Sequence, residues 1–322
     1  MDLDQRNLNA HVRARPQPRN TTMSSQPFRM IKGVVMKSAV ALVIAVVGWQ
    51  LLFASRPTAS FAGTKVTLGR VVAANEQVSM EQTSHAGWND LLGRYVDDAG
   101  FVNYRAWKAS AADAKALDQY LDVLSHANTS ARATREVRLA FWINTYNAVT
   151  VKGILREYPT TSIRNHTAKV FGYNIWEDLL LVVGGKPYSL SQIEHEVLRP
   201  MGEPRIHFAI VCASRGCPRL LNQAYTAAGL ERQLSENARD FFVKSSNFQY
   251  DAGSQTIRVS SIMEWFATDF GEGTAEQLKY ISRYAPDEAG KKLAASGTAR
   301  VSYLEYDWSL NDQATQRTAR GR

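Results

Sequence analysis

One uncharged apolar run divides this chain into two parts of different character. The run extends from Ser38 to Ala54, between Lys37 and Arg56. It is longer than the apolar core of a usual signal peptide and slightly shorter than the roughly 20 residues that cross a bilayer. Basic residues precede it, which favours a cytoplasmic N-terminal side. We therefore expect everything after the run to be exported.

The residues after the run leave two alternatives open. Ser60-Phe61-Ala62 fits the small-x-small pattern of a cleavage site, so the run is either the core of a cleaved signal peptide or a retained single-pass membrane anchor. We interpret residues 1–37 as a cytoplasmic extension, residues 38–54 as the signal or anchor, and residues 55–85 as a linker. The rest of the protein is then periplasmic, or anchored in the inner membrane with its domain exported.

The basic charge of the chain belongs mainly to this leader. The whole chain has a formal net charge of +8, but eight of its 38 basic residues and only two of its 30 acidic residues precede residue 63. A nucleic-acid-binding protein usually carries its basic patch on the folded part. We therefore expect no nucleic-acid partner, and contact with a membrane only through the N-terminal segment.

Residues 86–311 carry the patterns of one folded domain, with a polar tail at 312–322. Helical periodicity is found in some segments and strand-like runs with turns in others. We expect helices in 88–96, 112–128, 134–158, 189–199, 224–245 and 260–271. We expect hairpins, each of two strands joined by a turn, in 177–190 and 248–260, and single strands in 205–214 and 299–311. Because strands and helices do not alternate regularly, the class is α+β. We expect a single compact domain with a mixed sheet flanked by several helices.

The strongest predicted helix contains one residue that does not fit its apolar face. Thr134 is a suitable N-cap and Tyr158-Pro159 a suitable end. Asn144 lies in the middle of the apolar stripe, and a buried amide without partners costs about 1–3 kcal/mol. Asn144 is therefore either a structural clip to the backbone or part of a polar site.

The segment RIHFAIVCASRGCPRL, residues 205–220, contains both cysteines of the chain. Its first half reads as a central strand buried on both faces, with His207 and Cys212 on opposite faces. Pro218 favours the first position of a helix. Cys217 would then lie at a helix N-terminus, where the helix dipole lowers a thiol pKa. In the preceding helix, Ser191 and Glu194 have the spacing of a capping box.

Several blocks of the chain together resemble one family. These blocks are AFWINTYNA (140–148), LSQIEHEVLRP (190–200), RIHFAIVCASRGCPRL (205–220), AYTAAGLERQL (224–234) and YDWSLN (306–311). In this order they resemble the domain of unknown function 547 family, over roughly residues 86–311. The resemblance implies a fold and the location of a site, but no reaction. It also implies a bacterial member that is exported.

The residue types in these blocks allow several kinds of site. A thiol hydrolase or transferase would use Cys217 as nucleophile, His207 or His195 as base, and Asn144 or Glu194 to orient the base. A Cys212–Cys217 disulfide would instead lock the turn between them. Zinc could be bound by His207, Cys212 and Cys217 with His195 or Glu194, but the spacing matches no structural zinc pattern, so we expect neither metal nor cofactor. The Cys-x-x-Cys spacing of redox enzymes is absent.

Three arginines are candidates for binding an acidic group. Arg215 and Arg219 flank Cys217, and Arg199 ends the preceding helix. The alternative for Arg199 is an ion pair with Glu196 or with Asp307. The histidines outside these blocks, at positions 11, 85, 126 and 166, lie in linker-like or loop-like sequence and are expected to be solvated.

Two functions therefore remain open for the exported domain. The first is a cell-envelope thiol hydrolase or transferase that depends on Cys217. The second is a non-catalytic envelope module that binds an unidentified envelope component or peptide and is stapled by a Cys212–Cys217 disulfide.

Overall fold

The computed structural model describes residues 64–168 and 173–320, all within one compact unit, Phe61–Arg322. The predicted extension and the apolar run lie outside these residues. Among the described residues, no helix combines the length and apolarity needed to cross a membrane. The mixture of helices and small sheets confirms the α+β class.

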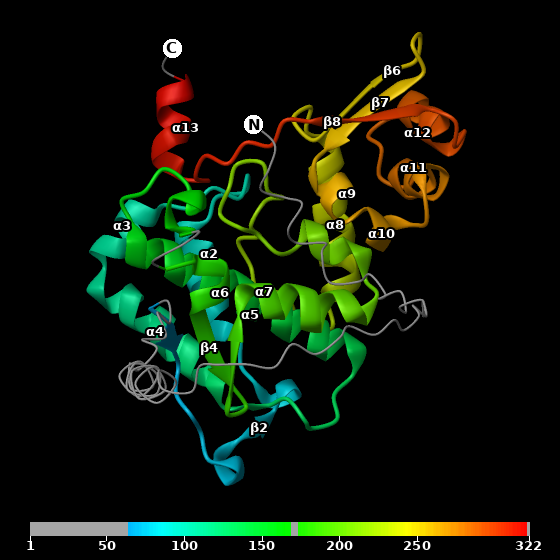
Figure 1. The fold of residues 1–322 in the computed structure, drawn as a ribbon. Helices are drawn as coiled ribbons and strands as arrows, with labels where there is room; N and C mark the ends of the chain where they lie inside the picture. Colours follow the sequence, from blue (N-terminus) through cyan, green and yellow to red (C-terminus); the bar gives the residue numbers. More distant parts are fainter. Residues whose placement is uncertain (1–63, 169–172, 321–322) are drawn as a thin grey trace, which may run out of the picture. The chain divides into compact units, whose positions relative to one another are not determined.

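The helices and strands follow one another without a repeating unit (Figure 1). The helices are α2 (Ala86–Tyr95), α3 (Tyr104–Ala109), α4 (Ala111–Ser125), α5 (Arg135–Glu157), α6 (Ile175–Asp178), α7 (Leu190–Gln192), α8 (Leu230–Val243), α9 (Ile262–Trp265), α10 (Ala267–Phe270), α11 (Thr274–Ser282), α12 (Glu288–Ala295) and α13 (Gln313–Arg320). The strands are β1 (Val66–Leu68), β2 (Val78–Ser79), β3 (Ala127–Asn128), β4 (Leu179–Val183), β5 (Lys186–Ser189), β6 (Phe248–Asp251), β7 (Thr256–Ser260) and β8 (Arg300–Leu304).

The described strands form three small sheets, with the orders β1-β4-β5, β2-β3 and β6-β7-β8, where we expected one mixed sheet. The two predicted hairpins are confirmed: β4 pairs with β5 and β6 with β7, both antiparallel. Residues 66–82, predicted as linker, belong to the domain, because β1 pairs with β4 and Met80 is buried in the core. The prediction of a polar tail at 312–322 also needs correction, because residues 313–320 form the helix α13.

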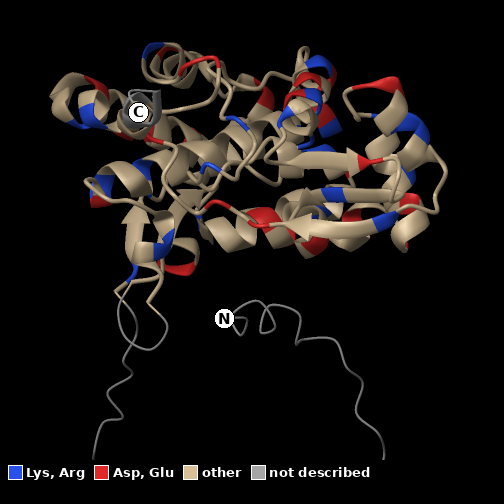
Figure 2. Ribbon diagram, turned by 90° about the horizontal axis from the view of Figure 1, so that it is seen from above, with Lys and Arg blue, Asp and Glu red and all other residues tan. Residues whose placement is uncertain are grey.

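The core is built around α5. From Leu139 to Leu155 every residue except Lys152 is buried, the pattern of a helix enclosed on all sides by protein. The sequence predicted both of its ends: the Thr134 side chain accepts a hydrogen bond from the Val137 N–H, and Tyr158 follows the last turn. A second apolar cluster joins α8 to β6, β7 and α11. Charges of both signs are interspersed over the surface of the domain (Figure 2).

The predicted central strand at 205–214 does not form. Pro204–Phe208 is a 3₁₀ helix, and the residues after it have no regular structure. Asparagine side chains occupy the backbone groups that a neighbouring strand would have paired. Asn147 donates from Nδ2 to the Ala209 carbonyl at 3.0 Å and accepts from the Val211 N–H at 2.9 Å. The apolar pattern that predicted a strand in this run therefore belongs to a buried loop.

Two more asparagines hold the continuation of this loop. Asn144 donates to the Tyr225 carbonyl at 2.8 Å and accepts from the Tyr225 N–H at 2.9 Å. Asn237 on α8 donates to the carbonyls of Phe208 and Arg219. Asn144 is thus the structural clip that the sequence left as one of two alternatives. Together Asn144, Asn147 and Asn237, which we call the asparagine clips, attach the loop 208–225 to α5 and α8.

We expect Asn147→Ala to lower the free energy of unfolding by about 2–4 kcal/mol, because it removes two buried hydrogen bonds and leaves two backbone groups unpaired. Urea unfolding followed by circular dichroism would measure the change. Asn222→Ala is a matched control, since the Asn222 side chain bonds Asp98 at the exposed surface and its loss should cost less than about 0.5 kcal/mol. Equal costs for the two variants would contradict the role of the clip.

Candidate functional site

The two cysteines lie at the ends of a tight turn held by the asparagine clips. Ala213 has a positive φ of 60°, and the Cys217 N–H donates to the Ser214 carbonyl at 3.2 Å. No helix begins at Pro218; the next one is α8, which starts at Leu230. The prediction of Cys217 at a helix N-terminus is therefore wrong, and a helix dipole does not account for the thiol chemistry here.

The C-terminal segment between β8 and α13 pairs with this turn (Figure 1). Backbone N–H groups of Arg215 and Gly216 donate to the carbonyls of Ser309 and Asp307, each at 2.8 Å. A Cβ atom on Gly216 would lie 2.9 Å from two ring carbons of Tyr306. Glycine at this position therefore lets the Tyr306 ring lie directly against the turn.

The side chain of Tyr306 ends at the two sulfur atoms. Its hydroxyl lies 3.0 Å from Cys217 Sγ and 3.4 Å from Cys212 Sγ. The two Sγ atoms are 2.7 Å apart, and both cysteines are free thiols. The Cys212 N–H also donates to Cys217 Sγ at 3.1 Å. We call Cys212, Cys217 and Tyr306 the thiol cluster.

The two thiols differ in exposure and acidity. Cys212 is half-buried, whereas Cys217 is 6% exposed. A hydrogen bond from Cys217 lowers the pKa of Cys212 to about 6, and burial raises the pKa of Cys217. The physical reason is that the first thiolate formed is stabilised by the remaining S–H, while a second negative charge at 2.7 Å would be strongly disfavoured.

Glu194 lies within electrostatic range of Cys212 and has an unusual environment. It sits in the π-helical turn Ile193–Leu198, and its Oε2 accepts a hydrogen bond from the buried Tyr146 hydroxyl at 3.3 Å. Burial, and then the negative charge on Cys212, raise the pKa of Glu194 to about 7. The predicted capping box is shifted by two residues, to Ser189 and Gln192. Glu194 is therefore free of a capping role and can exchange a proton near neutral pH.

The two histidines bond to other partners than the cysteines. His207 Nε2 donates to Asp269 Oδ2 at 2.8 Å, and its ring stacks on Phe266. Arg199 donates to both oxygens of Asp269 at 2.7 and 2.8 Å and also contacts His195 Nδ1 at 3.1 Å. Arg199 thus pairs with Asp269, and not with Glu196 or Asp307. Among residues 64–168 and 173–320, no hydrogen bond joins either histidine to a cysteine.

The remaining arginine candidates line a cavity of about 260 Å³ that reaches Cys217. Arg215 lies 3.9 Å from Asp307, and Arg219 donates to Asn237 Oδ1 at 2.8 Å. Lys244 and Glu305 line the same cavity, so charges of both signs surround it. Arg199 does not line it. The structure therefore brings two of the three predicted arginines to the thiol cluster.

Sequence reasoning missed the tyrosines and Asp269. Tyr306 and Tyr146 lie inside blocks noted for the resemblance, but no periodic signal marks a tyrosine whose hydroxyl points at a thiol or a carboxyl group. Asp269 lies far along the chain, 62 residues after its partner His207. Among the described residues, no set of three or more His, Cys, Asp or Glu side chains is arranged to hold a metal ion.

We expect the thiolate of Cys212 to form with a midpoint near pH 6, which absorbance of the thiolate against pH would show. Cys217→Ala removes the donor and should raise this midpoint by about one to two pKa units. Cys217→Ser, which keeps a hydroxyl donor, should raise it less. A midpoint near pH 6 that survives in Cys212→Ser and vanishes in Cys217→Ala would instead assign the acidic thiol to Cys217.

Comparison with known proteins finds one family model that matches part of the chain. No curated protein and no solved structure matches the chain. Residues 130–242 match the family described as "Protein of unknown function, DUF547". The matched region runs from just before α5 to α8 and contains Glu194, His207, both cysteines and all three asparagine clips. This match supports the resemblance to the domain of unknown function 547 over residues 130–242.

Proposed function

We propose that the protein carries out thiol–disulfide exchange with Cys212 as the attacking thiol and Cys217 as the resolving thiol. The observation that supports this most directly is the 2.7 Å separation of the two sulfur atoms in a turn clamped from both sides. A half-buried, acidic thiol beside a more deeply buried, less acidic one is the asymmetry that such chemistry needs, since only the thiolate attacks.

The reaction balances with a substrate disulfide as the co-reactant. The Cys212 thiolate attacks one sulfur, a mixed disulfide forms, and one half of the substrate leaves as a thiolate. Cys217 then attacks Cys212 Sγ, the Cys212–Cys217 disulfide forms, and the second half leaves. The substrate gains two electrons, the protein dithiol loses two, and the two leaving thiolates take up the protons of the pair.

Neighbouring groups have defined parts in this scheme. The Tyr306 hydroxyl, 3.0 Å from Cys217 Sγ, donates to whichever sulfur carries the negative charge. Glu194, with its pKa raised to about 7 by burial and by the charge on Cys212, is the group that exchanges protons with the thiol pair. Cys212 is half-buried, and the cavity of about 260 Å³ that reaches Cys217 gives room beside the sulfur from which the second half of the substrate departs.

The proposed location is outside the cytoplasm. The apolar run 38–54 and the small-x-small pattern after it support export of the domain. Disulfides persist in such compartments, so a disulfide-bonded peptide or protein of a bacterial cell envelope is the proposed partner. The proposal of export rests on the sequence alone.

The test is reaction of the reduced protein with oxidised glutathione, followed by intact mass. The wild type should lose two hydrogens and retain no glutathione. Cys217→Ala should stop at a stable glutathione adduct on Cys212, because the resolving thiol is missing, and Cys212→Ala should react at least tenfold more slowly. A stable adduct on the wild type, or equal rates in both variants, would refute the proposal.

One observation favours a second candidate, the thiol hydrolase or transferase. A carboxyl group that titrates near neutral pH lies within electrostatic range of Cys212, and it would protonate the leaving group after attack of the thiolate on an acyl carbon. The sequence assigned the nucleophile to Cys217; the exposure and acidity of Cys212 favour Cys212. This candidate needs one thiol only, so it predicts that Cys217→Ala keeps its activity on thioester substrates.

If neither reaction occurs, the protein is the non-catalytic module with a structural Cys212–Cys217 disulfide. In that case the pair is oxidised on isolation, and its reduction lowers the melting temperature without any exchange with glutathione.

A further inference from the structure

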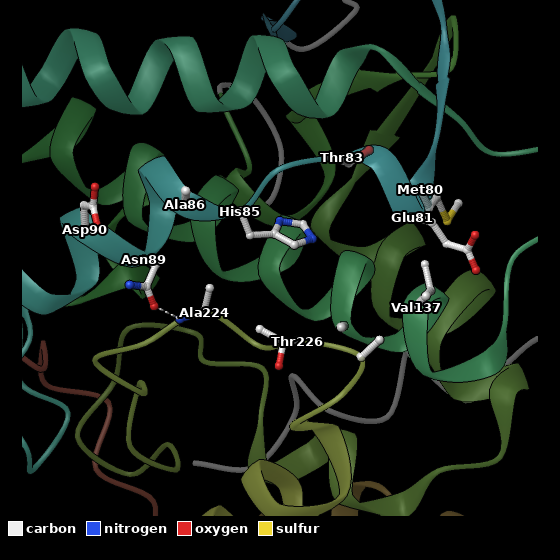
Figure 3. Close-up of a pocket in the computed structure, with 12 residues that line it drawn as sticks. Met80, Glu81, Thr83, His85, Ala86, Asn89, Asp90, Val137, Ala224 and Thr226 are labelled. Carbon is white, nitrogen blue, oxygen red and sulfur yellow. Dashed lines mark hydrogen bonds between the residues drawn. The ribbon is translucent and has the colours of Figure 1, made fainter.

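A second cavity lies apart from the thiol cluster. It has a volume of about 350 Å³, and none of the residues that line it lines the cavity at Cys217. Its walls are the segment 80–90, the start of α5 and the loop 224–227 (Figure 3). Met80, Val137 and Ala140 contribute apolar surface, and a few polar groups are set among them. This is the usual composition of a small-molecule site.

The walls of this cavity are fixed to one another. The Asn89 side chain accepts a hydrogen bond from the Ala224 N–H at 3.1 Å, so α2 is tied to the loop across one end of the cavity (Figure 3). Asn144 clips the next residue, Tyr225, and the Thr226 N–H donates to Gln233 Oε1 at 3.0 Å. The cavity therefore exists before any ligand binds.

His85 supplies one oriented donor. The sequence predicted that the His85 side chain is solvated. In the structure it is half-buried, and its ring faces the cavity (Figure 3). Burial lowers the pKa of His85 to about 4. Its Nδ1 lies 2.7 Å from the buried Tyr120 hydroxyl, for which the described residues offer no other acceptor. Tyr120 therefore donates to Nδ1. The neutral ring carries its proton on Nε2, which has no protein partner within the described part of the chain.

The charges around the cavity select the ligand. Glu81 and Asp90 line it, and among the described residues no Lys or Arg does. Figure 3 shows these two carboxylates toward opposite ends, with His85 between them. An anionic ligand would meet two like charges and no counter-charge, whereas a cationic one is favoured from either end.

We propose that this cavity binds a small apolar amine that carries a carbonyl oxygen, the chemistry of an amino-acid amide or of a peptide N-terminus. The apolar side chain fills the space against Met80 and Val137. The carbonyl oxygen accepts from His85 Nε2–H, and the ammonium group faces Glu81 or Asp90. This site is independent of the thiol chemistry proposed above.

Binding of leucinamide, measured by isothermal titration calorimetry on the whole protein, tests this proposal. The measurement is made near pH 6.5, where an α-amino group with a pKa of about 8 is protonated. We expect saturable binding to the wild type. N-acetyl-leucinamide, which has no charge, should bind about two- to fivefold more weakly. Leucine, whose carboxylate meets Glu81 or Asp90, should bind more weakly still.

Two variants separate this site from binding elsewhere. Val137→Phe fills the cavity and should abolish leucinamide binding, with circular dichroism to confirm that the variant is folded. Glu81→Gln combined with Asp90→Asn keeps the volume and should remove only the advantage of leucinamide over its acetylated form. The proposal fails if the wild type does not bind leucinamide, if Val137→Phe binds it equally well, or if leucine binds as tightly as its amide.

Discussion

The thiol cluster depends on hydrogen bonds between buried asparagine side chains and the backbone. Asn144, Asn147 and Asn237 satisfy backbone groups of a loop that passes through the interior. A buried loop without such partners would leave polar groups unpaired, each at a cost of about 1–3 kcal/mol. The amide side chain suits this task because it carries a donor and an acceptor in one plane. The clips thus make possible an irregular backbone next to α5, and with it the turn between the cysteines.

That turn brings two thiols closer than any regular element would. The C-terminal segment closes over it, and Gly216 leaves room for the Tyr306 ring. At 2.7 Å the two sulfur atoms share one readily lost proton, so acidity and nucleophilicity belong to the pair. Burial of Glu194 places a second titrating group in the same region of pH. The shifted pKa values of Cys212 and Glu194 therefore follow from burial and proximity, and within the described residues no histidine is bonded to either sulfur.

The histidines have a different part in the fold. His207 and Arg199 converge on Asp269, next to Phe266 and Phe270. The hydrogen bond from His207 to Asp269 ties the 3₁₀ helix Pro204–Phe208 to α10, and the half-buried ion pair between Arg199 and Asp269 ties the preceding turn to the same helix. These contacts fix the start of the loop 208–225, and the asparagine clips hold the rest of it. His207 and the two cysteines are close together in sequence, but in the structure His207 contacts Asp269 and Phe266 while the cysteines contact Tyr306.

The sequence by itself determined the features that depend on local periodicity and on end signals. These include α5 with its Thr134 cap, the amphipathic α8, both hairpins, and the presence of both cysteines and Glu194 in one region. It also marked Asn144 as anomalous, because an amide in an apolar stripe needs a partner.

The tertiary structure decided what those residues do. The run 205–214 has the pattern of a strand, but the Asn147 side chain, 62 residues before Ala209 in sequence, pairs with backbone groups that a neighbouring strand would have paired. Tyr306 reaches Cys212 from 94 residues away, and Asp269 reaches His207 from 62. Such contacts leave no periodic signal, since they depend on where the chain returns and not on its neighbours. The difference in acidity between the two thiols follows from the hydrogen bond between them and from the burial of Cys217.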